Sequence, residues 1–435
     1  MIYIMADDLT GANDTGVQFA KNGYKTKVLI LNDEFKNIEF ENNHDVLVID
    51  TETREVEENV ARSKLIKILQ EIKVSKEDII YKKIDSTLRG NVGAEIEEIM
   101  TILKKHFCII SPSFPSHQRV TIGGNLLVEQ KLLGLSGYVD NIKGKKMESY
   151  IPSLLGQQTK LSIGRIDLSE VSKGQFSIEK NLNELIEKKK KIIVVDSSNE
   201  RHLKDIVSSG IKFSDKILFS GSAGLANYLV KKFNKNKELS INTINIKDNK
   251  QPVLIVGGSK NPVMLDQIEY LINHLKFAVL KIDIKQIFYQ EKRVLDNYVN
   301  ECLEIIMKNQ DLIIYNDAVY NKKELIDEKL MQEYQLCYKE LGNRIKEFFG
   351  KLASVVIRES KTKNLVLTGG DIAVSVCSKL KISELELIGE LLPGIPIASA
   401  HFKDNTLNII TKAGGFGKKE TLFELINKFR NSNKK

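Results

Sequence analysis

Short apolar runs, each ending on a small or acidic residue, recur along this chain and alternate with segments of helical period. Within residues 91–106, for example, Val92, Ile96 and Ile99 would share one face of a helix. Strands that alternate with helices usually form parallel sheets. We therefore predict an α/β fold of two domains, each a mainly parallel sheet covered by helices. The predicted strands are residues 2–5, 27–31, 45–50, 78–85, 107–111, 191–196, 216–220, 252–257, 311–315, 364–369 and 407–411.

One segment interrupts this rhythm and predicts the domain boundary. The chain has 435 residues, which is more than one hydrophobic core usually supports. Residues 232–251 are crowded with Asn and Lys and cannot bury much surface, so we interpret them as a linker. An alternative for the same segment is a short strand through Ile241, Ile244 and Ile246. The predicted first domain, linker and second domain are residues 1–233, 234–251 and 252–435.

The charge and the cysteine content of the chain narrow its possible binding partners and its cellular compartment. The net charge is +8, but the Lys residues are scattered and mostly accompanied by Glu, and the chain has no Trp. This pattern argues against nucleic acid and favours anionic small molecules. The four cysteines form no CxxC pair, which argues against a zinc site and favours a reducing compartment. Asp7 follows the first Met too soon for a signal peptide, and no uncharged apolar run approaches membrane length. We predict a cytoplasmic protein with no membrane contact.

The first predicted strand ends at a cluster of acidic residues. Asp7 and Asp8 are adjacent, and Thr10 and Asp14 follow in the same segment. Carboxylates that repel one another need a reason to be gathered, such as hydrogen bonding to a polyhydroxy substrate, metal binding or proton transfer. The structural alternative is a capping loop with Thr10 or Asp14 at a helix N-cap. Because the cluster stands at a strand end, we favour a functional site.

A second informative segment is Lys82-Lys83-Ile84-Asp85-Ser86-Thr87-Leu88-Arg89-Gly90-Asn91. Asp85 can accept a hydroxyl proton, and the Arg89 guanidinium can bind a carboxylate bidentately. N–H groups of a helix that begins near Asn91 could bind an anion. The alternative is a surface turn with a solvated Arg89, and for the two lysines both interpretations stay open.

Two further loops of the first half could bind an anion. The loop at 111–124 offers Arg119, Thr121 and the pair Gly123-Gly124, while His117 is more typical of an exposed residue. The turn at 221–225 reads Gly-Ser-Ala-Gly-Leu. It could hold an anion through its backbone or simply begin a helix tightly.

In the second half, three glycine-bearing loops each follow a predicted strand. They are residues 257–262, 368–371 and 412–418. Glycine lets a backbone approach phosphate oxygens, and a following helix N-terminus favours negative charge. None of the loops matches a Walker or a Rossmann pattern. Three such loops in one domain predict a nucleotide site.

Taken together, these motifs resemble the four-carbon acid sugar kinase family. The resemblance rests on the ADDLTGA-x-DTG opening, the K-x-DSTLRGN segment, the SPSFP…R-x-T-x-GG stretch and the GSAGL turn. LTGGD, LPGIP and TKAGGFG follow in the family's order. The resemblance implies a sugar-binding N-terminal domain and a nucleotide-binding C-terminal domain, whose members phosphorylate D-threonate, 3-oxo-tetronates and related acids with ATP.

The resemblance also implies roles for individual residues. Carried over by position, Asp7, Asp8, Asp85 and Arg89 are expected to face the acid sugar. Apart from the resemblance, we predict that Thr10, Gly90 and Arg119 also bind the substrate. The residues expected by position to hold ATP are Ser259, Gly369, Gly370, Asp371, Ile372, Gly414 and Gly415. The chain departs from the family pattern at three sites: Ile372 and Ala413 each replace a hydroxyl-bearing residue, and the pair Lys260-Asn261 replaces a Cys-Ser-like pair.

We predict an ATP-dependent kinase that acts on a terminal hydroxyl, at C4, of a four-carbon sugar acid. Asp8 or Asp85 would accept the hydroxyl proton, Arg89 would bind the substrate carboxylate, and Mg²⁺ would bridge the phosphates. The active site would lie in the cleft between the domains, and a homodimer is compatible with this scheme. The alternatives are a 4-hydroxythreonine kinase, a sugar-acid sensor without catalysis, and a phosphatase or phosphotransferase with an aspartyl nucleophile. Neither the exact acid nor the choice of base follows from the sequence.

Overall fold

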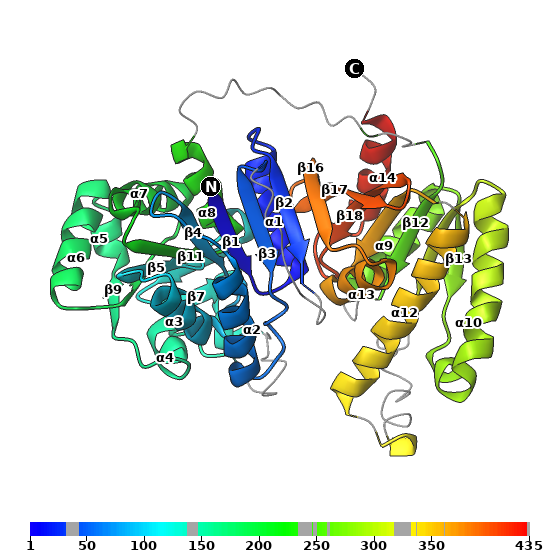
Figure 1. Ribbon diagram of the computed structural model, residues 1–435, viewed down its shortest axis with the longest axis horizontal. Helices are drawn as coiled ribbons and strands as arrows, with labels where there is room; N and C mark the ends of the chain where they lie inside the picture. The colour runs from blue at the N-terminus through cyan, green and yellow to red at the C-terminus, as the bar shows by residue number, and fades with distance from the viewer. Residues whose placement is uncertain are drawn as a thin grey trace. The chain divides into compact units, whose positions relative to one another are not determined.

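The computed structural model divides into two compact units, Met1–Ser240 and Ile241–Lys435 (Figure 1). The residues that it describes are 1–31, 43–136, 147–233, 246, 250–258, 262–316, 332–335, 337–360 and 362–432. Most of the predicted linker lies outside these residues, as do Ile241 and Ile244 of the alternative strand. Ile246 is buried but belongs to no strand.

A wholly parallel sheet forms the centre of the first unit. Its strands are buried apolar runs, as in β1, where all five side chains are buried. Burial on both faces explains why these strands read as continuous hydrophobic segments in the sequence. In spatial order they are β2 (Thr26–Ile30), β3 (Val46–Asp50), β1 (Ile2–Ala6), β4 (Ile79–Lys83), β11 (Ile217–Gly221), β5 (Phe107–Ser111), β10 (Ile192–Val195) and β9 (Ile163–Ile166).

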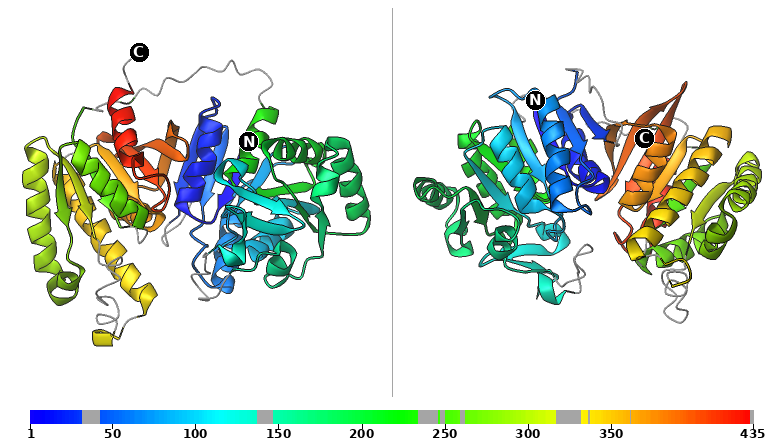
Figure 2. Two further views of the ribbon diagram at one scale, coloured as in Figure 1. Left: turned by 180° about the vertical axis from the view of Figure 1, so that it is seen from behind. Right: turned by 60° about the horizontal axis from the view of Figure 1, so that its bottom comes forward.

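Helices pack on the sheet of the first unit in two groups (Figures 1 and 2). In one group, α1 contacts α8, α8 contacts α7, and α7 contacts α6. In the other group, α2 contacts α3, and α3 contacts α4. A small antiparallel sheet of β6 (Arg119–Ile122), β7 (Asn125–Val128) and β8 (Lys131–Leu132) is added after β5. The helix bounds are α1 (Leu9–Ala20), α2 (Glu58–Glu71), α3 (Val92–Ile102), α4 (Ile151–Gly156), α5 (Leu168–Val171), α6 (Gln175–Glu187), α7 (Glu200–Gly210) and α8 (Ala223–Phe233).

The second unit has a mixed sheet. Five parallel strands come first in spatial order: β13 (Phe277–Lys281), β14 (Asp311–Tyr315), β12 (Val253–Gly257), β15 (Asn364–Thr368) and β18 (Asn405–Lys412). The antiparallel strands β17 (Ile395–Phe402) and β16 (Glu384–Leu392) then continue from β18. Helices α9 (Pro262–His274) and α14 (Thr421–Asn431) pack together, while α12 (Tyr338–Ser360) contacts both α10 (Ile284–Met307) and α13 (Gly370–Leu380).

The predicted α/β class is confirmed, and every predicted strand is present within one or two residues of its expected bounds. Prediction missed β9, β13, the hairpin β16–β17 and the small sheet. The sequence of β16 alternates polar and apolar residues, and its burial alternates with them. A search for continuous apolar runs overlooks such a strand, because only one of its faces packs on the core.

Candidate functional site

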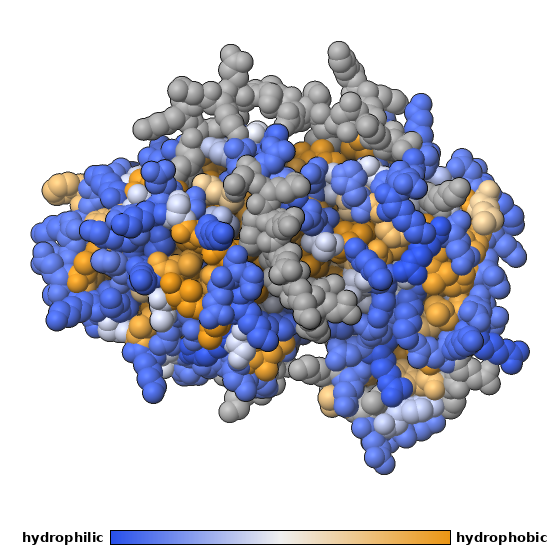
Figure 3. Space-filling model, viewed as in Figure 1, coloured by the Kyte–Doolittle hydropathy of each residue, from blue (hydrophilic) through white to orange (hydrophobic). Residues whose placement is uncertain are grey.

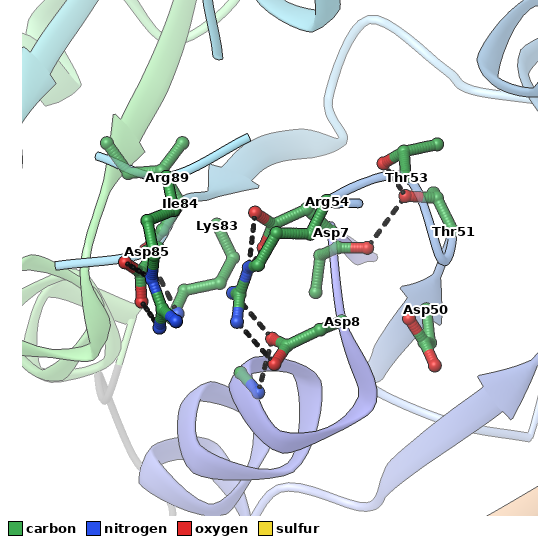
Figure 4. Close-up of polar contacts among 12 residues, drawn as sticks. Asp7, Asp8, Asp50, Thr51, Thr53, Arg54, Lys83, Ile84, Asp85 and Arg89 are labelled. Atoms are coloured by element: carbon green, nitrogen blue, oxygen red, sulfur yellow. Dashed lines mark hydrogen bonds and ion pairs between the residues drawn. The ribbon is translucent and has the colours of Figure 1, made fainter. Parts of the chain in front are cut away.

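Neighbouring strand ends of the first unit bring the predicted acidic residues together. In the sheet register, Ala6 of β1 lies beside Asp50 of β3 and also beside Lys83 of β4. Asp7 and Asp8 therefore leave the sheet between the segment after β3 and the loop after β4 (Figure 4). Strands β3 and β2 lie on one side of β1, and β4 lies on the other. Such a switch point is where open α/β sheets bind ligands.

Arg54, which the sequence interpretation did not single out, binds both of these carboxylates. Its Nε and Nη2 donate to the two oxygens of Asp7 at 3.0 and 2.8 Å. Its Nη1 and Nη2 donate to Asp8 at 2.5 and 2.6 Å. The side chains of Arg54 and Asp7 are only 12% and 3% exposed, so these charge-assisted bonds are largely shielded from water. One guanidinium thus fixes two adjacent carboxylates.

The backbone around Arg54 is tied to the same strand end. The N–H groups of Thr53 and Arg54 both donate to the carbonyl of Asp7 at 3.1 Å. Asn91 precedes α3, and its side-chain Nδ2 donates to the carbonyls of Thr53 and Val56 at 3.0 and 2.9 Å. The segment after β3 is therefore held between the end of β1 and the loop after β4.

Asp8 is also the N-cap of α1, since its Oδ1 accepts the Gly11 N–H at 2.8 Å. The capping alternative named Thr10 or Asp14 and was wrong about the residue; Thr10 lies in the first turn and is partly exposed. A Cβ on Gly11 would lie 2.6 Å from Asp8 Oδ1 and 2.8 Å from the Nζ of Lys83. Glycine is required here because the two charged groups close in on the helix backbone.

Asp85 and Arg89 form a second ion pair in the loop after β4. The Arg89 Nε and Nη2 donate to the two Asp85 oxygens at 2.8 and 3.1 Å. The Thr87 hydroxyl and N–H also donate to Asp85. The Arg89 side chain is 32% exposed, and its Nη1 makes none of the hydrogen bonds described. Arg89 can therefore offer a further donor to an anionic ligand.

Gly90 places this loop directly against the first ion pair. Its φ is +94°, a conformation that glycine adopts without strain. A Cβ on Gly90 would lie 3.3 Å from Asp7 Oδ2 and 3.4 Å from the Arg54 Cα. The two predicted segments, 6–16 and 82–91, are thus packed into one cluster with Arg54 (Figure 4).

The cations determine the charge of this cluster. Burial alone would raise the pKa of Asp7, but Arg54 and the two lysines at the end of β4 outweigh burial and lower that pKa. For Asp85, burial again acts to raise the pKa, while Arg89 and Arg54 hold it well below its usual range. Both groups are carboxylates at neutral pH and can accept hydrogen bonds from a polyhydroxy ligand.

Three further ionisable groups are buried close to the cluster. Lys82 forms an ion pair with Glu95 of α3, and the two side chains are 0% and 1% exposed. Asp50 is fully buried, and its Oδ2 has no hydrogen-bond partner in the part of the chain described. Burial, then the charges of Glu52 and Asp8, raise the pKa of Asp50 well above its usual range. Asp50 therefore favours the protonated acid, in contrast to Asp7.

The loop after β5 is braced internally. The Asp196 carboxylate accepts the N–H groups of Gly123 and Gly124 at 2.6 and 2.9 Å. The anion expected at this glycine pair is therefore a carboxylate of the protein itself. The predicted substrate residue Arg119 donates from Nη1 to the His117 carbonyl at 2.6 Å. Arg119 begins β6 and is not among the residues grouped around Arg54.

The turn at 221–225 serves as a tight helix start. The Ser222 hydroxyl donates to the Ser113 carbonyl at 2.8 Å and accepts the Gly224 N–H at 3.1 Å. The Tyr81 hydroxyl donates to the Ser222 carbonyl at 2.5 Å. These bonds join the ends of β4, β5 and β11, which favours the structural alternative for this turn.

The three glycine loops of the second unit also leave one sheet edge. Gly257 of β12 lies beside Thr368 of β15, and Thr368 lies beside Lys412 of β18. Because these strands are parallel, the residues that follow them emerge together. Strand β14 lies on the other side of β12 from β15, which makes this edge the switch point of the second unit.

The predicted ATP residues 369–372 form the beginning of α13. Gly369 has φ of +95°, precedes the helix and donates its N–H to the Lys412 carbonyl at 2.8 Å. Gly370 and the exposed Asp371 start the helix, and Ile372 is buried. A Cβ on Gly258 would lie 2.4 Å from the Ile372 Cδ1. The family departure at 372 is thus an apolar contact that packs on the glycine loop after β12.

The remaining predicted ATP residues fall in two places. Gly414 and Gly415 form a turn closed by a bond from the Phe416 N–H to the Ala413 carbonyl at 3.0 Å. Ser259 and Asn261 lie outside the described residues. No three His, Cys, Asp or Glu side chains among the described residues are grouped as metal ligands.

The next feature is the distribution of apolar residues over the helices and the surface. Within the described part of the chain, no helix combines the length and apolar character that a membrane span needs. The face drawn in Figure 3 is mainly hydrophilic, with apolar residues in scattered groups.

Both halves of the chain match known domain families. Residues 2–229 match a sugar-binding N-terminal domain, and residues 254–422 match a nucleotide-binding C-terminal domain. The first match alone covers more than half of the chain. The two matches assign the carboxylate and guanidinium cluster to a sugar-binding domain and the glycine loops to a nucleotide-binding domain.

Curated relatives match over most of their length. The chain is 29% identical to the D-threonate kinase of Salmonella typhimurium over 98% of this chain and 97% of the relative. It is 27% identical to the D-erythronate kinase of Heliobacterium modesticaldum over 90% and 88%. It is 24% identical to the 3-oxo-tetronate kinase of Haemophilus influenzae over 98% of both chains.

Solved structures share the fold. A crystal structure from Salmonella typhimurium superposes with a TM-score of 0.80 at 22% identity and covers 98% of both chains. One from Haemophilus influenzae gives a TM-score of 0.72 at 22% identity and covers 98% of this chain and 100% of its own. At this level of identity the likeness shows the fold alone.

Proposed function

The chain belongs to the four-carbon acid sugar kinase family, and from this premise we propose that it transfers the γ-phosphoryl group of ATP to the C4 hydroxyl of a four-carbon sugar acid. One observation carries the proposal. Each unit gathers most of its predicted binding residues at the switch point of its own strands; Arg119 lies elsewhere in the first unit, and Ser259 lies outside the described residues. The first switch point offers carboxylates and guanidinium groups, and the second offers glycine backbone and a helix N-terminus.

The first cluster has the groups that a sugar acid requires. Arg89 keeps one donor free of Asp85 and is the proposed partner of the substrate carboxylate. Asp7 binds Arg54 and its side chain is only 3% exposed, which leaves little access for a substrate hydroxyl, so it is the proposed anchor of the cluster rather than the base. Thr10, in the first turn of α1, is a proposed partner of a substrate hydroxyl.

Asp8 and Asp85 are the candidates for the base. The Asp8 side chain is 20% exposed and that of Asp85 13%, so both are more exposed than Asp7. Phosphoryl transfer needs orientation and charge neutralisation more than a strong base, so a carboxylate can serve even where, as at Asp85, its pKa is lowered. We propose that the carboxylate of either Asp8 or Asp85 orients the acceptor hydroxyl and takes its proton.

On the nucleotide side, we propose that the N-terminus of α13 and the turn at Gly414-Gly415 hold the phosphates. Asp371 is the one acidic side chain in the first turn of α13. We propose that Mg²⁺ arrives on the phosphates with several of its waters retained. In-line transfer requires the bound acid and the bound nucleotide to meet in the reacting complex. We propose that closure of the two domains brings the two ligands together and excludes water.

The test is an ATP-consumption assay with purified protein against threonate, erythronate, their 3-oxo forms and 4-hydroxythreonine. We expect turnover of at least one four-carbon acid, with the phosphate on C4 by NMR. Ligand binding without ATP turnover by any panel member would favour the sensor alternative instead. Turnover of 4-hydroxythreonine alone would move the proposal to an amino-acid substrate.

A further inference from the structure

The buried lysine at the end of β18 has no role in the scheme above. Lys412 is 1% exposed, and burial lowers its pKa to about 7, because the interior disfavours the ammonium. An aliphatic side chain could fill the same space without this cost. A lysine at this position therefore calls for a reason other than packing.

The ammonium of Lys412 binds the turn that follows it. Its Nζ donates to the carbonyl of Ala413 at 2.9 Å and to the carbonyl of Gly414 at 3.3 Å. The Phe416 N–H donates to the same Ala413 carbonyl and closes the turn. Two successive carbonyl groups thus point toward the buried side chain.

The N–H groups of these two peptide units point the opposite way. In a trans peptide unit the C=O and the N–H lie on opposite sides of the C–N bond. With the carbonyls of Ala413 and Gly414 turned toward Lys412, the N–H groups of Gly414 and Gly415 are directed away from it. Gly414 is partly exposed, and Gly415 is exposed. The turn therefore presents two donors on its outer side.

This turn is fixed to the helix N-terminus that the nucleotide is proposed to use. Lys412 lies beside Thr368 in the sheet, and its carbonyl accepts the Gly369 N–H at 2.8 Å. Gly370 then starts α13. The outer donors of the turn and the first N–H groups of α13 belong to one edge of one unit.

We propose that Lys412 is a positioning residue for a nucleotide phosphate: it holds two carbonyls inward and so presents the N–H groups of Gly414 and Gly415 to the phosphate oxygens. The inference rests on the proposed use of ATP. Lys412 acts through the turn and does not touch the ligand.

The test compares ligands with and without phosphate in Lys412→Met, which keeps an unbranched side chain of similar size and removes the terminal amino group with its donors. We expect the affinities for ATP and ADP, measured by calorimetry, to fall about 10- to 100-fold. The affinity for adenosine should stay within about twofold. Lys428→Met is the matched control: it removes one exposed lysine from α14 and should change neither affinity.

Three other outcomes of these binding measurements would count against the inference. Equal weakening of ATP and adenosine would show general damage to the unit, and unchanged affinity for ATP would show that the turn needs no lysine. If the wild-type protein binds adenosine but no nucleotide phosphate, the inference and the proposed use of ATP both fail. If only Lys412→Met loses phosphate-dependent affinity, the inference stands.

A measurement on the wild-type chain covers the case in which Lys412→Met does not fold. In a ¹H–¹⁵N spectrum, ADP should shift the amide resonances of Gly414 and Gly415, and adenosine should leave them in place. Shifts of equal size with both ligands, or with neither, would overturn the proposed orientation of the turn.

Discussion

At the switch point of the first unit, Arg54 binds two carboxylates, and Arg89 binds a third beside them. At the switch point of the second unit, the corresponding positions are Gly258, Gly369 and the Gly414 turn. The first edge is therefore made of charged side chains, and the second of backbone. Side-chain chemistry depends on the identity of each residue, whereas backbone chemistry depends on conformation.

This difference explains how the chain can depart from its family at the second edge. Ile372 is buried and packs toward Gly258, and Ala413 takes part through its carbonyl. Neither position needs a side-chain hydroxyl to keep the backbone donors in place. At the first edge, by contrast, each change of a side chain alters a charge or a hydrogen bond directly.

The largest effect is expected from the candidate bases. Asp8→Asn or Asp85→Asn at the true base should lower kcat by roughly 10²–10⁴-fold, because the amide cannot take the hydroxyl proton. The affinity for ATP should stay unchanged in both variants, since both residues lie in the first unit. Steady-state kinetics with the best acid of the panel will measure this. If both variants keep the wild-type kcat, the assignment of the base is wrong.

Arg54→Met should have the next largest effect. It would leave Asp7 and Asp8 adjacent without their shared cation, and breaking a buried ion pair costs about 3–5 kcal/mol of folding free energy. Because this cluster is proposed to bind the acid, we expect kcat/KM for the acid to fall roughly 10²–10³-fold. Urea unfolding and kinetics together test both parts.

Arg62→Met is the matched control for that variant. Arg62 also bonds several carboxylates, Glu58, Glu97 and Glu98, but on the helices α2 and α3. Its side chain is 24% exposed, so its loss should cost about 1 kcal/mol or less. Equal kinetic losses in the two variants would show that the cluster has no special role.

A smaller effect is expected from a methyl group at the backbone edge. Gly369→Ala places an L-residue at φ of +95°, which costs about 1–3 kcal/mol in strain. The start of α13 should shift, and KM for ATP should rise about 10-fold while KM for the acid stays constant. Gly156→Ala, where a Cβ meets nothing within 4 Å, is the control and should behave as wild type. An equal rise in both KM values would contradict the division of labour between the edges.

Much of the fold could be predicted from sequence because buried parallel strands leave continuous apolar runs. The run Ile2–Ala6 is an example, with every side chain buried. The strand β16 shows the limit, since its alternating exposure depends on a neighbour that is distant in sequence. A local sequence pattern indicates that a strand is buried on both faces, but it does not indicate which strand pairs with it.

The site shows the same limit at the level of single residues. Asp7, Asp8, Asp85 and Arg89 stand in dense polar motifs at strand ends, so their residue types drew attention. Arg54 stands four residues after the end of β3, in a segment with no motif, and its role comes from the register that puts β3 beside β1. A search of every strand end for a basic residue would have found it. The internal role of Asp196 at Gly123-Gly124 could not be predicted, because that contact spans 73 and 72 residues.

The smallest predicted effect concerns two carboxyl groups of the first edge that differ in the direction of their pKa shift. Arg89 and Arg54, acting against burial, lower the pKa of Asp85, so the charged form stabilises the fold above the unfolded pKa of about 4. That stability is lost as the pH falls through the folded value. The destabilisation caused by Asp85→Asn should therefore be greatest near neutral pH and shrink in acid.

Asp50 should behave in the opposite way. Because burial raises its pKa, its stabilising contribution is complete below the unfolded pKa and is lost as the pH rises through the folded value. Relative to the wild type, Asp50→Asn should therefore gain stability with rising pH, while Asp85→Asn loses it. Urea unfolding of the three proteins between pH 4 and pH 8, at about one-unit steps, measures both slopes. Slopes of the same sign would mean that Asp50 is ionised and paired in the folded protein, and the first edge would then hold one more fixed negative charge to repel an anionic substrate.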